Sequence, residues 1–144
     1  MSTRAAIVAA ARGWIGTPYM HQQRMRGVGI DCAGLVIAVA RECGLVDEGF
    51  DLTGYAMQPD GSLLGITDAH MRRVAAPQPG DVAVFRIEHE PQHLGIVADY
   101  VHGGLSVIHA LDQRGHKRGR VVEHRIDDEW RSRIVAAYAL PGVA

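Results

Sequence analysis

The sequence has little cysteine, few aromatic residues and almost no net charge. Cys32 and Cys43 are its two cysteines, aromatic residues make up 6% of the 144 positions, and the formal net charge is −1. Two cysteines are too few for a disulfide-stapled scaffold, and the absence of a basic block excludes electrostatic binding of nucleic acid or of a membrane surface. No apolar run is long enough to span a bilayer. The sequence therefore predicts one globular domain, residues 1–144, with no nucleic-acid or membrane partner.

The amino terminus lacks the features of a secretion signal. Arg4 is a lone early basic residue, and no small-residue cleavage site precedes Trp14. We therefore expect Thr3 to cap a helix rather than to belong to a signal peptide. These features predict a protein made in the cytoplasm, where both cysteines stay reduced.

Apolar periodicity predicts helices in the first half of the chain. Residues 3–15 place apolar side chains at helical spacing. Residues 32–43 are apolar almost all round, which is typical of a buried helix, with Asp31 as its N-cap and Gly44 just after its end. Residues 62–73 predict a further short helix.

Beyond residue 80 the pattern changes to short alternating runs. Runs of strand length occupy residues 81–87, 93–100, 105–111, 119–126 and 133–140. They predict a meander of antiparallel strands that packs one face against the buried helix. Helices followed by strands define an α+β fold.

Cys32 is the strongest candidate for a nucleophile. It lies in the expected first turn of the buried helix, where unpaired amides and the helix dipole favour a thiolate. The alternative is a buried structural cysteine, which is the ordinary role of this residue type. Cys43, at the other end of the helix, is expected to fill the core.

Two of the eight histidines are candidates for a base and its orienting partner. If about five residues form the hairpin loop, Asp99 pairs with Leu105. His109 then lies opposite Gly95, two residues from His93 on the same face of the sheet. A shift of one residue in register would put the two rings on opposite faces. The two histidines are therefore predicted to form a hydrogen-bonded pair in the register that puts both rings on one face. The alternative is that they are two separate core histidines.

Residues 89–93, His-Glu-Pro-Gln-His, match the HExxH pattern of zinc peptidases. That pattern requires a helix, and Pro91 in a short connection between two strands leaves no room for one. We therefore expect no metal or other cofactor, with His89 and Glu90 in a loop near the active-site rim. The other histidines are expected on surfaces or in loops: His21, His70, His102, His116 and His124.

Three further side chains have both a structural and a functional interpretation. Tyr19 is either a half-buried packing residue or an oxyanion donor beside the backbone amide of Cys32. Arg24 and Arg26 could contact an anionic substrate, although solvated loop arginines are commoner.

Five segments resemble, in family order, the motifs of NlpC-type cysteine peptidases. They are Gly16-Thr-Pro-Tyr19, Gly29-Ile-Asp-Cys-Ala-Gly-Leu-Val36, Pro79-Gly-Asp-Val-Ala-Val-Phe85, His93-Leu-Gly-Ile-Val97 and Ile108-His-Ala110. Residues 21–29 and 130–138 are more similar to the phage branch of that family, the cell-wall peptidases of tail and gene-transfer-agent clusters.

The resemblance implies a papain-like α+β domain in which the nucleophile-bearing helix packs on an antiparallel sheet of about five strands. It implies Cys32 as nucleophile, His93 as base and His109 as the residue that orients the base. Tyr19 and the backbone amide of Cys32 would hold the oxyanion. Asp31 matches the acidic position that can contact the amine of a stem peptide.

The activity implied by the resemblance is hydrolysis of peptidoglycan stem peptides, at the bond between D-glutamate and a diamino acid. The partners would be the stem peptide and other phage tail proteins, and the enzyme would act at the cell wall as part of a phage or phage-like particle. Ala33 departs from the serine usual after the cysteine, and the interval from His93 to His109 is longer than is common. One alternative is a tail-assembly or wall-binding module with little hydrolysis. Another is an amidase or acyltransferase that uses the same triad.

Overall fold

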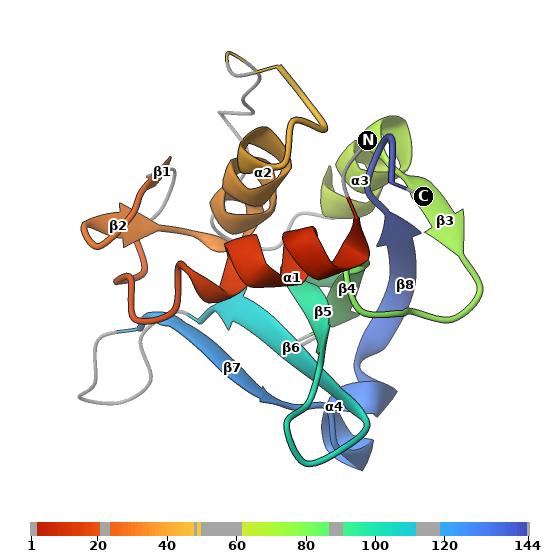
Figure 1. Cartoon of the computed structure of the whole chain (residues 1–144). Coiled ribbons are helices and arrows are strands. Elements are labelled where there is room, and N and C mark those ends of the chain that lie inside the picture. Colours follow the sequence, from red (N-terminus) through yellow and green to blue (C-terminus); the bar gives the residue numbers. More distant parts are fainter. Residues whose placement is uncertain are drawn as a thin grey trace.

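The computed structural model describes residues 3–20, 24–47, 49, 62–86, 91–111 and 119–143. Figure 1 shows the helices and strands that these residues form. In chain order they are α1 (Arg4–Arg12), β1 (Arg24–Met25), β2 (Gly29–Ile30), α2 (Cys32–Glu42), α3 (Ser62–His70), β3 (Arg72–Val74), β4 (Val82–Arg86), β5 (Pro91–Asp99), β6 (Leu105–Ala110), β7 (Val121–Arg125), α4 (Asp128–Ser132) and β8 (Ile134–Ala139). None of the described helices is long and apolar enough to cross a membrane.

The first two helices begin at the predicted caps. The Thr3 side chain accepts a hydrogen bond from the Ala6 amide at 3.1 Å, and the Asp31 side chain accepts one from the Gly34 amide at 2.8 Å. Gly44 follows α2 with a φ of +68°, a backbone conformation that glycine adopts without strain. Residues 34–40 of α2 are all buried, so the prediction of a buried helix is confirmed.

The main sheet has six antiparallel strands in the order β3-β8-β4-β5-β6-β7. Strands β4 to β7 form the predicted meander, but the prediction is wrong for the last strand. β8 does not continue beside β7, because it returns to pair with β4, with Val82 opposite Tyr138. β3 then pairs with the outer side of β8. The strands β1, β2 and β3 and the helix α4 are additions that the sequence pattern did not indicate.

Both faces of the central strands are buried. On one face, α1 and α2 pack against the sheet in the main core (Figure 1). On the other face lies a smaller apolar cluster that includes Phe85, Val97, Val107 and Trp130. The predicted meander with one buried face is therefore incomplete, because the segment around α4 covers part of the second face. This second face carries the histidines described next.

Candidate active site

Cys32 is the first residue of α2, and backbone hydrogen bonds hold the segment that precedes it. Tyr19 forms a parallel bridge with Ile30, two residues before the cysteine. The Ile30 amide donates to the Pro18 carbonyl at 2.9 Å, and the Met20 amide donates to the Ile30 carbonyl at 2.9 Å. The main chain of Tyr19 therefore runs beside the segment that leads into Cys32. Its role as oxyanion donor stays a prediction.

The thiol of Cys32 is in an environment that favours its protonated form. Desolvation by burial is the largest effect and, together with the negative charge of Asp31, raises the pKa of Cys32 to about 11. The backbone amides of Leu94, Ala33 and Cys32 itself hydrogen bond to the sulfur and oppose this rise. Burial thus outweighs the amides at the helix start and shifts the pKa in the direction opposite to the one that the helix start alone predicts. The contact with the Leu94 amide also places the sulfur beside the strand position that follows His93.

His93 and His109 form the predicted pair. Asp99 lies opposite Leu105 and Ile96 opposite Ile108, so the predicted register of the hairpin is confirmed. Nε2 of His93 lies 2.6 Å from Nδ1 of His109, which is hydrogen-bond distance. The two residues are 8% and 0% exposed. The pair is therefore a buried, directly bonded unit rather than two separate core histidines.

Gly95 lets the two strands approach closely at this point. A Cβ atom there would lie 2.4 Å from Cγ2 of Val107 and 3.2 Å from Cβ of His109. The first distance is far inside van der Waals contact. A glycine at position 95 thus allows the close approach of β5 and β6 beside His93 and His109.

His124 extends the pair to a row of three histidines. Its Nε2 lies 2.8 Å from Nε2 of His109, and its Nδ1 lies 2.9 Å from the carbonyl oxygen of Arg125. His124 does not lie in a loop: it is half-buried on the edge strand β7, which pairs His124 with Val107 on the face that carries His109. Pairing of the predicted strands 105–111 and 119–126 is consistent with this position. The sequence did not indicate it, because the register across the residues between the two strands could not be derived.

Trp130 covers this row of histidines. Its ring centroid lies 5.1 Å from that of His109 in an edge arrangement and 4.8 Å from that of His124. The ring of Phe85 lies 5.4 Å from Trp130 and 6.2 Å from His93. The aromatic rings lower the local dielectric around the hydrogen bonds and so strengthen them.

Arg24, which lies in β1, and Arg26 are both engaged within the protein. Nη1 of Arg24 lies 3.1 Å from Oδ1 of Asp31. Arg26 pairs with Glu42 at 2.7 Å and lies over the ring of Trp14. A substrate amine that contacted Asp31 would have to share its carboxylate with Arg24. The substrate-binding role of Asp31 stays a prediction.

The remaining predicted site residues divide between described and undescribed positions. His93 belongs to strand β5 and not to a helix. His89 and Glu90 lie outside the described residues, as do His21 and His116. Among the residues that the structure describes, no group of three or more His, Cys, Asp or Glu side chains is arranged to hold a metal ion.

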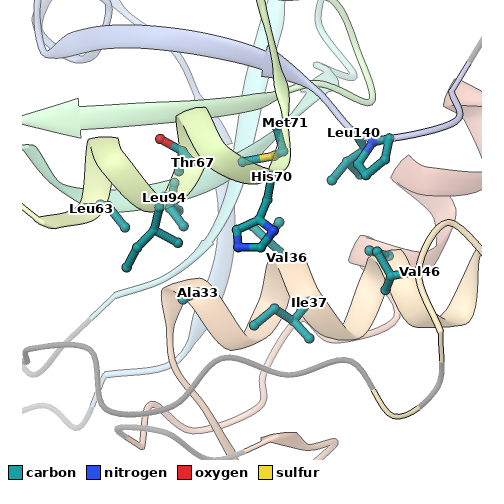
Figure 2. A pocket seen from close by; sticks show the side chains of 13 residues that line it. Ala33, Val36, Ile37, Val46, Leu63, Thr67, His70, Met71, Leu94 and Leu140 are labelled. Carbon is teal, nitrogen blue, oxygen red and sulfur yellow. The ribbon is translucent and has the colours of Figure 1, made fainter.

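An apolar pocket of about 130 Å³ is lined in part by Ala33, the residue after Cys32. Figure 2 shows side chains from α2, from α3 and from β5 around it, among them Ala33, His70 and Leu94. Ala33 follows Cys32 in the chain and Leu94 follows His93. A substrate group on this side of the sulfur would therefore meet a largely apolar surface.

The structure is similar to solved NlpC/p60 domains. The NlpC/p60 domain of the peptidoglycan hydrolase SagA superposes with a TM-score of 0.62 and 25% identity, covering 95% of this chain and 98% of that one. A lipoprotein-like protein of the NLP/P60 family from Staphylococcus aureus subsp. aureus Mu50 has a TM-score of 0.62 and 18% identity, covering 96% and 41% of the two chains. NlpC1 from Trichomonas vaginalis has a TM-score of 0.55 and 15% identity, covering 94% and 42%.

This chain thus spans nearly all of the SagA domain and less than half of the other two proteins. No protein-family model matches the sequence. No curated protein matches it either. The α+β fold is that of the papain-like NlpC/p60 domains, with helices packed on a mainly antiparallel sheet.

Proposed function

We propose that this protein is a cysteine peptidase that hydrolyses peptidoglycan stem peptides. The observation that carries the proposal is the bonded pair His93–His109 in an NlpC/p60 fold, together with Cys32 at the start of a buried helix, whose sulfur accepts a hydrogen bond from the amide of Leu94, the residue after His93. A nucleophile, a base and a group that orients the base are the parts that nucleophilic acyl transfer requires. The SagA domain, which has the same fold, is described as part of a peptidoglycan hydrolase.

The reaction runs through a thioester. The sulfur of Cys32 attacks the amide carbonyl while its proton passes to His93, because the thiol is protonated at rest. The carbonyl oxygen becomes an oxyanion, which the amide of Cys32 and the hydroxyl of Tyr19 stabilise. The C–N bond then breaks as His93 returns the proton to the leaving amine. Water attacks the thioester, gives a proton to His93 and releases the acid, and the proton returns to the sulfur.

The proposal also covers which bond the enzyme cuts and where it acts. The resemblance of the five motifs supports the bond between D-glutamate and a diamino acid, with Asp31 near the free amine of the stem peptide. The similarity of residues 130–138 to the phage branch supports action at the cell wall within a phage or phage-like particle. Other tail proteins would then be its partners.

Digestion of purified peptidoglycan tests the proposal. Wild-type protein and Cys43→Ala should release stem-peptide fragments, whereas Cys32→Ala should release none. Cys43 is the matched control because it lies at the opposite end of α2. Mass spectrometry of the products identifies the bond that is cut. Fragment release by Cys32→Ala at the wild-type rate would disprove a cysteine mechanism.

A wall-binding module with little hydrolysis is the second candidate. The raised pKa of Cys32 fits the weak hydrolysis of such a module, because a protonated thiol is a poor nucleophile when no base acts on it. In that case wild-type protein would sediment with insoluble peptidoglycan and release no fragments. Rapid fragment release at neutral pH would exclude this candidate.

A further inference from the structure

The row of three histidines ends on a group that can only accept a hydrogen bond. Nδ1 of His124 lies 2.9 Å from the carbonyl oxygen of Arg125. A carbonyl oxygen has no proton to donate, so Nδ1 of His124 must carry one. In a neutral imidazole the other nitrogen is then unprotonated. Nε2 of His124 is therefore an acceptor.

This constraint passes from ring to ring along the row. Nε2 of His124 lies 2.8 Å from Nε2 of His109, so Nε2 of His109 must be the donor in that contact. Nδ1 of neutral His109 is then an acceptor, and Nε2 of His93, 2.6 Å away, must donate to it. In neutral His93 the unprotonated nitrogen is consequently Nδ1. One backbone carbonyl thus sets the proton positions on three side chains.

The surroundings of His124 hold it in this arrangement. The ring of Trp130 lies against it, with centroids 4.8 Å apart. The preceding residue on β7, Glu123, accepts hydrogen bonds from Arg12 at 3.0 Å and from Ser106 at 2.6 Å. These contacts tie β7 to α1 and to β6. The donor and acceptor nitrogens of His124 are therefore presented in a defined position.

We propose that His124 is a positioning residue that acts through His109 on the base. By accepting a hydrogen bond from His109, it fixes His93 in the Nε2–H form, whose Nδ1 takes the proton from the thiol of Cys32. The catalytic role of His124 rests on the proposed function. The positions of the protons on the three rings do not depend on any substrate.

Two substitutions separate this role from simple packing. His124→Phe keeps a ring against Trp130 and removes both nitrogens. His124→Gln supplies a carbonyl oxygen that can accept the hydrogen bond from His109. On soluble muropeptides we expect His124→Phe to lower kcat about 10- to 100-fold with little change in KM, the loss typical when the partner of a positioned imidazole is removed. His124→Gln should restore most of kcat.

Nitrogen NMR of the imidazole rings tests the arrangement directly. In wild-type protein at neutral pH, His124 should be the Nδ1–H form, and His109 and His93 should be the Nε2–H forms. In His124→Phe, His109 should populate both forms. Wild-type His109 in the Nδ1–H form, or a folded His124→Phe with wild-type kcat, would overturn the inference. Equal loss of kcat in the Phe and Gln variants would also overturn it, because packing alone would then explain the effect.

Failure of the proposed function gives a different result. If wild-type protein does not cleave muropeptides but shows the three expected ring forms, with His109 mixed in His124→Phe, the peptidase proposal fails. The control of His109 and His93 by His124 would then stand on the NMR data alone. Thermal unfolding of both variants shows that each is folded at the temperature of the measurements.

Discussion

Arg24 and Asp31 form an ion pair immediately before Cys32, with Nη1 and Oδ1 3.1 Å apart. The same carboxylate oxygen accepts the Gly34 amide at 2.8 Å and so caps α2. The side chains of Arg24 and Asp31 are 10% and 1% exposed. One carboxylate therefore joins β1 to the start of the helix that carries Cys32.

Removal of the arginine should destabilise the protein. Arg24→Met removes this cation from the buried carboxylate of Asp31, and we expect the free energy of unfolding to fall by about 3 kcal/mol. Arg26→Met is the matched control, because Arg26 and its partner Glu42 are 57% and 34% exposed. The control should change the free energy of unfolding by less than about 1 kcal/mol. Urea denaturation measures both, and equal effects would contradict a structural role specific to the Arg24–Asp31 pair.

Alkylation of Cys32 should depend steeply on pH. Burial raises the pKa of its thiol to about 11, and the thiolate is the form that reacts with iodoacetamide. In a Cys43→Ala background, the rate should therefore rise about tenfold per pH unit from pH 7 to pH 10. Mass spectrometry follows the modified fraction with time. A rate that levels off below pH 8 would show a thiolate already formed at rest, in conflict with the raised pKa.

Substitution of Gly95 should disturb the histidine pair. In Gly95→Ala the new methyl group would collide with Val107 and press on His109, and we expect a loss of about 1 to 3 kcal/mol in stability. The activity on peptidoglycan should fall further than this destabilisation alone accounts for, because the His93–His109 contact is displaced. Gly65→Ala is the control.

Gly65 lies in α3 with no atom within 4 Å of an added Cβ. Gly65→Ala should leave activity unchanged and raise helix stability by up to about 1 kcal/mol. Activity assays and thermal unfolding of the two variants make the comparison. Wild-type activity in Gly95→Ala would show that the two histidines need not be in contact.

Local signals were sufficient to predict the buried helix that begins at Cys32 and the histidine pair. The capping side chain of Asp31 and the glycine at position 44 bracket α2, and both act within a few residues of the helix. The hairpin that joins His93 to His109 is also local, because the loop length sets its register. Sequence arguments are reliable where a few adjacent residues determine the geometry.

The rest of the site depends on contacts between distant segments. His124 and Trp130 reach His109 only because β7 and α4 fold back over the second face of the sheet. β8 likewise pairs with the edge of β4 that β5 leaves open, and no short sequence pattern indicates this pairing. The pKa of Cys32 depends on what packs over the sulfur, so the helix start alone indicated the wrong direction of its shift.

The place of β8 in the sheet also constrains the order in which the protein can fold. β8 lies between β3 and β4, so β3 has no partner in the sheet until the final strand arrives. The hairpins from β4 to β7, which carry the three histidines, join strands that are neighbours in the chain and can form early. During synthesis the histidine row can thus assemble before the sheet is complete. The edge of β4 stays open to wrong partners until β8 closes it.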